Sequence, residues 1–170
     1  WGPTAHVYQS PEGSYLARHG FGYSRFEHTA DEIESQLVQF VPESDSLKVS
    51  VLILRNAGTR PRRLAVTAFV EWVLGPNRGA GIPYIRTERS EATGALFARN
   101  PWNRDQGGRI ACLHVGGTRQ SWTGDRSEFI GRLGRHDEPA ALLDGTALSG
   151  RLGTGFDPCG AVRTEIDLAP

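Results

Sequence analysis

The sequence predicts an all-β protein: a two-sheet antiparallel β-sandwich with one short helix. Its clear periodicity is two rather than 3.6, and no helical stretches alternate with strands. The 21 glycines and 10 prolines interrupt the chain at short intervals, as turns between strands do. A chain of 170 residues suits one domain, residues 1–170, and is long enough to bury a core.

Two segments show the strand pattern most clearly. In 47–53 the odd-numbered positions are all apolar, and in 64–74 the even-numbered positions are all apolar. A helix over 64–74 would put Thr67 and Glu71 on its buried side, so a strand is the better interpretation. The polar connection 55–62 contains glycine and proline and predicts a hairpin between the two strands.

Further strands are expected on both sides of this hairpin. They are 22–28, 33–41, 82–88, 95–100, 110–115, 120–123 and 161–168. A short helix should follow Gly124, because Asp125 and Glu128 have the spacing of a capping box. The stretch 133–156 is rich in Gly, Asp, Pro and Ala and predicts a long loop over one sheet edge.

The sequence argues against two classes of partner, nucleic acid and membranes. The 19 basic and 19 acidic residues give a net charge of zero, and the arginines are scattered, so nucleic acid is not an expected partner. The longest apolar stretches, 49–54 and 64–74, are too short to cross a bilayer, and no signal sequence opens the chain. We therefore expect no direct membrane contact.

Two further features concern the origin of the chain and its cysteines. The chain begins with Trp1 and contains no methionine, which indicates an excised piece of a longer protein. Cys112 and Cys159 are too few for a disulfide scaffold, and their spacing leaves open whether they pair. We expect both to be small buried hydrophobic residues.

No motif for catalysis is found. The histidines form no metal-binding pattern; they are His6, His19, His28, His114 and His136. Phosphate-binding loops and nucleophile elbows are absent, and nothing pairs two carboxylates as sugar hydrolysis requires. We therefore expect no activity of this chain alone, no metal and no cofactor.

Three clusters combine aromatic rings with hydrogen-bonding side chains. In 18–28, Tyr23 and Phe26 offer ring faces to sugar C–H groups and Arg25 offers a forked donor. The alternative is a strand with a glycine bend whose rings alternate between core and surface.

The second and third clusters also have two interpretations. In 98–103, Trp102 between two asparagines could stack on a pyranose ring while Asn103 bonds its hydroxyls, or Trp102 could anchor a loop on the sheet. In 121–132, Asp125 is better interpreted as a helix cap than as a ligand contact, and Trp122 as a core residue. Trp72, within an apolar strand face, is expected in the core.

These clusters carry a family resemblance. Together with 62–72 and 157–161, they occur in an order that resembles the N-terminal β-sandwich domain of glycoside hydrolase family 94, formerly glycosyltransferase family 36, which includes cellobiose and chitobiose phosphorylases. The motifs are most similar to those of cyclic β-1,2-glucan synthases, and the resemblance runs from Arg18 to Leu168. It implies a supersandwich of two large antiparallel sheets, similar to galactose mutarotase. In relatives an (α/α)₆ barrel carries the catalytic acid, so the reaction would belong to the parent protein.

The resemblance implies an accessory carbohydrate-binding or scaffold domain. The expected site residues are Tyr23, Arg25, Trp102 and Asn103. Expected partners are a β-glucan or gluco-oligosaccharide, the catalytic barrel, and a second copy in a homodimer. In a glucan synthase the domain would lie at the cytoplasmic face of the inner membrane, as part of a larger membrane protein.

Two alternatives remain open. One is a purely structural module for docking or dimerisation, without a glycan site. The other is a stand-alone epimerase using Glu27 and His28, which is disfavoured because adjacent strand residues point to opposite faces.

Overall fold

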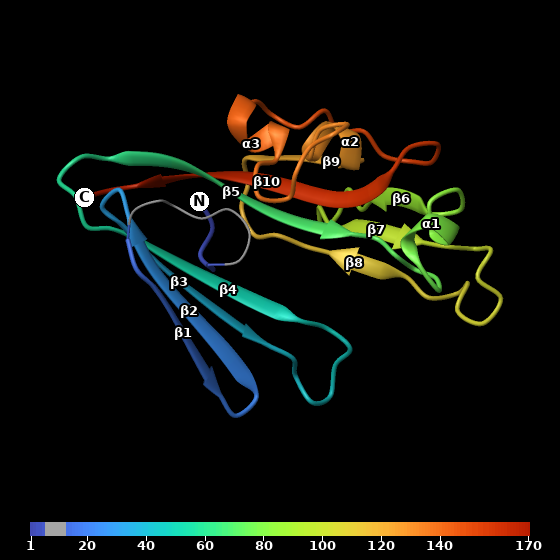
Figure 1. Cartoon of the computed structure of the whole chain (residues 1–170), viewed down its shortest axis with the longest axis horizontal. Helices are drawn as coiled ribbons and strands as arrows, with labels where there is room; N and C mark the ends of the chain where they lie inside the picture. Colours follow the sequence, from blue (N-terminus) through green and yellow to red (C-terminus); the bar gives the residue numbers. More distant parts are fainter. Residues whose placement is uncertain (6–12) are drawn as a thin grey trace. The chain divides into compact units, whose positions relative to one another are not determined.

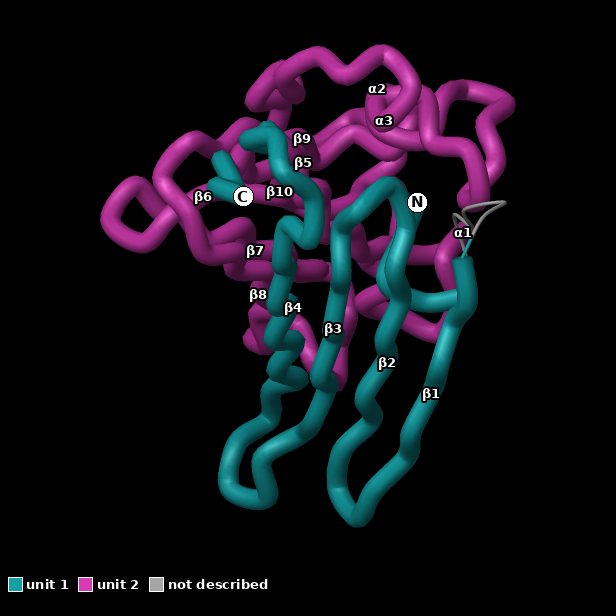
Figure 2. The backbone as a smooth tube through the Cα atoms, turned by 90° about the vertical axis from the view of Figure 1, so that its left-hand side faces the viewer, with its two compact units in different colours: residues 1–63, 167–170 teal, residues 64–166 magenta. Residues whose placement is uncertain are grey.

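The computed structural model describes residues 1–5 and 13–170, so His6 lies outside the described residues (Figure 1). Strands in antiparallel sheets dominate it, which confirms the all-β prediction. The chain divides into two compact units, residues 1–63 with 167–170 and residues 64–166, each in its own colour in Figure 2. Within the described part of the chain, no helix has the length and apolar character needed to cross a membrane.

The first unit contains a four-stranded antiparallel sheet in the order β1-β2-β3-β4. Its strands are β1 (Tyr15–Gly20), β2 (Tyr23–Ala30), β3 (Ile33–Phe40) and β4 (Val49–Asn56). Strand β1 was not predicted, because its sequence lacks an apolar alternation; it pairs in register with β2. The β2–β3 turn consists of Asp31 and Glu32, both at positive φ (51° and 63°), as a tight type I′ hairpin requires.

The two faces of this sheet differ. Ala30, Ile33 and Leu37 are buried on one face. On the other face Val51 and Ile53 are 43% and 53% exposed, although they belong to the apolar alternation that predicted the strand. We call this second side, which carries Leu16, Tyr23, Phe40, Val51 and Ile53, the Tyr23 face.

The second unit contains two three-stranded sheets, β5-β10-β9 and β6-β7-β8. The strands are β5 (Arg62–Glu71), which begins in the first unit, β6 (Arg86–Arg89), β7 (Leu96–Arg99), β8 (Ala111–Leu113), β9 (Gln120–Asp125) and β10 (Pro158–Leu168), which ends in the first unit. Three short helices are described rather than the one predicted: α1 (Arg78–Gly81), α2 (Arg126–Phe129) and α3 (Ala140–Asp144). The predicted strand 82–88 begins only at Arg86, because α1 and its C-cap Ile82 occupy the preceding residues. Helix α3 lies within the predicted loop 133–156.

Two apolar clusters form the core of the second unit. One contains Phe129 of α2 and the C-cap residue Ile130, both packed in a cluster that also contacts Phe69. The other contains Trp72, Ile85 and Ala98. Trp72 is 7% exposed, which confirms it as a core residue. Trp122 is not in either cluster: it is half-buried, with the guanidinium carbon of Arg89 3.8 Å from its ring centroid.

The cysteines do not pair, and the prediction that both are buried is wrong for Cys112. Its neighbours Ala111 and Leu113 on β8 turn toward the core, so Cys112 points the other way and is exposed. Cys159 on β10 is fully buried.

Candidate functional site

The exposed aromatic side chain of Trp102 lies in the connection between β7 and β8. We call residues 100–109 the Trp102 loop. The indole is 72% exposed, and its ring centroid lies 5.1 Å from that of Tyr84, with the planes tilted by 32°. Tyr84 itself is 40% exposed. The two rings therefore form an aromatic pair at the surface of the second unit.

Hydrogen bonds within the Trp102 loop fix its shape. The buried side chain of Asn100 accepts from the backbone N–H of Trp102 (3.1 Å) and donates to the carbonyl of Leu74 (2.9 Å). Asn103 Oδ1 accepts from the backbone N–H groups of Asp105 and Gln106, both at 3.2 Å. The side chain of Asn103 thus shapes the loop, and its amide nitrogen is the group left to bond a ligand.

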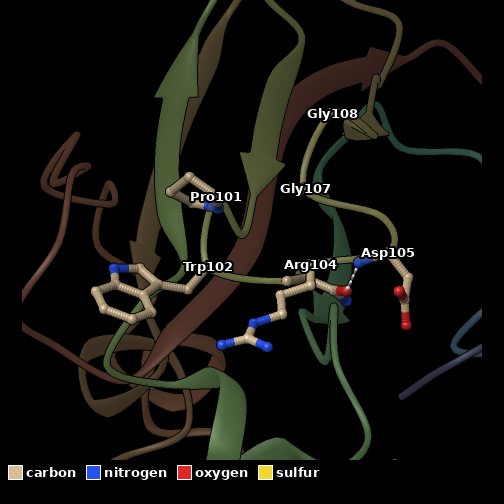
Figure 3. Close-up of a pocket in the computed structure, with 7 residues that line it drawn as sticks. Pro101, Trp102, Arg104, Asp105, Gly107 and Gly108 are labelled. Atoms are coloured by element: carbon tan, nitrogen blue, oxygen red, sulfur yellow. Dashed lines mark hydrogen bonds between the residues drawn. The ribbon is translucent and has the colours of Figure 1, made fainter.

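The loop surrounds an open hollow of about 550 Å³. Its lining is Pro101, Trp102, Asn103, Arg104, Asp105, Gly107 and Gly108. Figure 3 shows the guanidinium of Arg104 extending toward the side where the Trp102 indole lies, while the Asp105 carboxylate points the other way. The hollow therefore combines an aromatic face with a forked hydrogen-bond donor, the residue types that recognise a sugar.

Tyr23 and Arg25 lie together on β2, in the first unit. Tyr23 is 47% exposed and its ring covers Gly20 of β1, where an added Cβ would lie 2.2 Å from the ring. Arg25 is paired with Glu27, which also binds Arg18. The charge of Arg25 is thus already partly neutralised, which weakens it as a ligand donor.

The predicted site residues therefore form two groups, one in each unit. Tyr23 and Arg25 are neighbours on the Tyr23 face, and Trp102 and Asn103 are neighbours in the Trp102 loop. Sequence reasoning missed Tyr84, since 82–88 was expected to be a strand rather than the turn that follows α1.

The residues of the epimerase alternative do not converge. Glu27 pairs with arginines on the Tyr23 face. The neighbouring His28 is buried, stacks on Tyr15 with ring centroids 3.7 Å apart, and bonds the carbonyl of Ser14 through Nδ1. Since the two side chains lie on opposite sides of the sheet, they cannot meet on one substrate.

A second group of charged side chains was also missed. Glu71 at the end of β5 contacts Arg126 of α2 and Arg78 of α1 (Nε–Oε2, 3.4 Å), and Arg78 also pairs with Asp157. We call these four residues the ion-pair cluster. Burial acts to raise the pKa of Glu71, but the hydrogen bond from Arg126 and the charges of Arg126 and Arg78 outweigh it and lower the pKa. The two carboxylates balance the two guanidinium groups, so the cluster has no excess positive charge with which to bind an anion. Its role is to join β5 to α1 and α2.

Asp125 has the structural role predicted for it. Its side chain caps α2 by accepting from the backbone N–H of Ser127 (2.9 Å), and it also accepts from Arg151 (2.7 Å). Glu128 does not close the capping box; it accepts instead from Thr123 Oγ1 (2.6 Å) and from the backbone N–H of Ser149 (2.7 Å). Burial acts to raise the pKa of Glu128, but these hydrogen bonds lower it.

Comparison with known proteins places this fold in a family. Residues 1–170 match the family described as glycosyl hydrolase 94, supersandwich domain. The cyclic β-(1,2)-glucan synthase NdvB of Rhizobium meliloti (strain 1021) is 35% identical over 166 residues. The N,N'-diacetylchitobiose phosphorylase of Vibrio proteolyticus is 22% identical over 174 residues, and the solabiose phosphorylase of Paenibacillus borealis is 27% identical over 177 residues.

The alignments cover most of this chain but little of the relatives. They span 98%, 100% and 100% of the chain, and 6%, 21% and 22% of the synthase and the two phosphorylases, respectively. The relatives are whole enzymes, and the part they share with this chain is one domain. The match over the full chain shows that this protein belongs to the glycosyl hydrolase 94 supersandwich-domain family.

Proposed function

We propose that this chain is an accessory domain of a glycan-processing enzyme, of the glycoside phosphorylase or cyclic β-1,2-glucan synthase type. We further propose that its Trp102 loop holds a β-linked gluco-oligosaccharide. The observation that carries the proposal is the 72% exposed indole on a hydrogen-bonded loop. The names of all three relatives refer to carbohydrates, which supports a sugar as the ligand.

The chemistry of the loop fits a neutral sugar. The indole of Trp102 offers a flat apolar surface to the C–H groups of a pyranose ring. Asn103 and the guanidinium of Arg104 offer donors to its hydroxyls. Bond cleavage or transfer would occur in the catalytic barrel of the parent enzyme, which would be a glycosyltransferase or phosphorylase acting on β-glucan. Tyr23 and Arg25 are proposed as a second, weaker contact in the first unit.

Isothermal titration with a β-1,2-gluco-oligosaccharide at millimolar concentration tests the proposal. We expect measurable heat for the wild type and none for Trp102→Ala, since the stacking surface is removed. Tyr23→Ala should weaken binding less. Leu133→Ala is the control, because it removes a 97% exposed apolar side chain outside the loop. A wild type that is folded by circular dichroism and gives no heat would refute glycan binding.

A second candidate function is a docking module without a glycan site, and the Tyr23 face favours it. Five apolar side chains, each 37–53% exposed, share this face, and a partner could bury them. The proposed partner is the catalytic barrel of the parent enzyme. Val51→Thr with Ile53→Thr should then weaken association with a separately produced barrel in a pull-down, whereas unchanged association would exclude this face. A second copy of the chain is the other proposed partner. Sedimentation velocity tests this homodimer, and a monomer at all concentrations would contradict it.

The position in the cell is also a proposal. If the parent enzyme is of the glucan synthase type, we propose that the domain lies at the cytoplasmic face of the inner membrane. Protease treatment of intact spheroplasts should then leave it uncut, and cleavage there would contradict this location.

A further inference from the structure

We infer that Tyr84 is a positioning residue, which holds the Trp102 indole in a fixed orientation so that one ring face is ready for a sugar. Only the statement that this orientation serves sugar binding rests on the proposed function. The orientation itself can be measured without a ligand.

The ring contact is the first argument. An indole that is 72% exposed has few neighbours to restrict its two side-chain torsions. The ring of Tyr84 lies against it, with centroids 5.1 Å apart and planes tilted by 32°. This separation is within the range in which aromatic pairs attract each other beyond simple surface burial. The contact therefore selects one orientation of the Trp102 ring.

Tyr84 can act in this way because its own backbone is fixed. Asn77 caps α1 by accepting from the N–H of Ala80 (2.9 Å), and the N–H groups of Tyr84 and Ile85 both bond the carbonyl of Gly81 (3.0 and 3.2 Å). Ile85 is 2% exposed and anchors the turn in the core. Gly81 is required for this close packing, since an added Cβ would lie 2.6 Å from the carbonyl oxygen of Val73.

The segments that carry the two rings are also tied to each other. Asn100 accepts from the N–H of Trp102 and donates to the carbonyl of Leu74, which precedes α1. One buried amide side chain thus joins the Trp102 loop to the segment that leads to Tyr84. A ring that is already ordered loses less conformational entropy when a ligand binds. The affinity of the domain for the ligand is therefore higher.

Indole ¹⁵N relaxation measures the ordering directly. In the ¹⁵N-Trp-labelled chain, the Trp102 Nε1–H signal is identified by its loss in Trp102→Phe. We expect a rigid Trp102 indole in the wild type and in Tyr84→Phe, which keeps the ring. In Tyr84→Ala the Trp102 signal should show fast motion while that of core Trp72 stays unchanged. A Trp102 indole that is as ordered in Tyr84→Ala as in the wild type would overturn the inference.

Titration then tests the purpose of the ordering. The contact energy of an aromatic pair predicts that Tyr84→Ala weakens affinity for a β-1,2-gluco-oligosaccharide about 2- to 10-fold, and that Tyr84→Phe leaves it unchanged. Equal affinity of Tyr84→Ala and wild type would show that positioning does not serve binding. If the wild type binds no glucan, the proposed function fails while the relaxation result still decides the ordering. Should Tyr84→Ala not fold, Tyr84→Leu removes the ring and keeps the apolar volume.

Discussion

Replacing Glu71 by glutamine should destabilise the protein substantially. Glu71 contacts both Arg126 and Arg78, and Arg126 is the most buried member of the ion-pair cluster, with 18% of its side chain exposed. Glutamine keeps the size of the side chain but removes its charge. The guanidinium of Arg126 would then be largely out of water and would have lost its nearest carboxylate.

The expected cost follows from the exposure of the partners. Exposed ion pairs contribute about 0–1 kcal/mol, whereas removing one partner of a buried pair costs about 3–5 kcal/mol. The side chains of the cluster are 18–34% exposed, between these two cases. Asp157 remains as a carboxylate 4.0 Å from Arg126 and limits the loss. We therefore expect Glu71→Gln to lower the free energy of unfolding by about 2 kcal/mol.

The same group predicts a pH dependence. The pKa of Glu71 is lower in the folded protein than its ordinary value of 4.5. Such a carboxyl stabilises the fold fully at pH values above 4.5, and this stabilisation is lost as the pH falls through 4.5 toward the folded pKa. The wild type should therefore lose stability below about pH 5, and Glu71→Gln should lose less over the same range.

Urea denaturation followed by tryptophan fluorescence at pH 7 and pH 4 measures both effects. Glu34→Gln is the matched control, because its partner Arg55 is 73% exposed and the pair should contribute less than about 0.5 kcal/mol. Equal unfolding midpoints for Glu71→Gln and Glu34→Gln at pH 7 would refute the assignment of a stabilising role to the ion-pair cluster.

Three further predictions concern separate positions. Gly160→Ala should cost about 1–3 kcal/mol in urea denaturation, because the added Cβ would lie 2.6 Å from the Trp72 ring, whereas Gly116→Ala, with open space around it, should cost less than about 1 kcal/mol. Asn100→Ala should lower stability by about 1–3 kcal/mol, since the carbonyl of Leu74 and the N–H of Trp102 lose their partner; an unchanged midpoint would contradict that role. Cys112 should react with a thiol reagent at pH 7 in the folded chain, while Cys159 reacts only in urea, because burial raises its pKa; equal labelling rates would refute this.

Local patterns in the sequence were sufficient for two strands and for one helix cap. The period of two located β4 and β5, because each has apolar residues at alternate positions. The predicted hairpin between them is wrong, since β4 pairs with β3 and β5 pairs with β10 in a different sheet. Asp125 was recognised as a cap from its spacing to Glu128, and it does cap α2, although through the N–H of Ser127 and without the help of Glu128. Both predictions depend only on neighbours along the chain.

Features that depend on distant residues were not predictable in this way. Strand β1 lacks an apolar alternation, so its own residues do not reveal that it pairs with β2 up to 13 residues away. Glu128 bonds Ser149, which is 21 residues away, rather than the cap beside it. The sequence around Trp102 suited a packing anchor and an exposed ring equally, and the position of Tyr84 beside it depends on the turn after α1. The candidate site was therefore predicted by residue type, whereas its geometry came from the structure.

The tight turn at Asp31 and Glu32 constrains how this family can vary in evolution. The strands on either side pair without a gap, from Ala30 opposite Ile33 to Tyr23 opposite Phe40. One inserted residue that shifts this pairing would exchange the two faces of β3, bringing Leu37 to the Tyr23 face and Val38 to the opposite one. The longer connection 41–48 can change in length without shifting the pairing of the strands on either side of it. Among homologous sequences, insertions and deletions should therefore accumulate at 41–48 and be rare at 31–32.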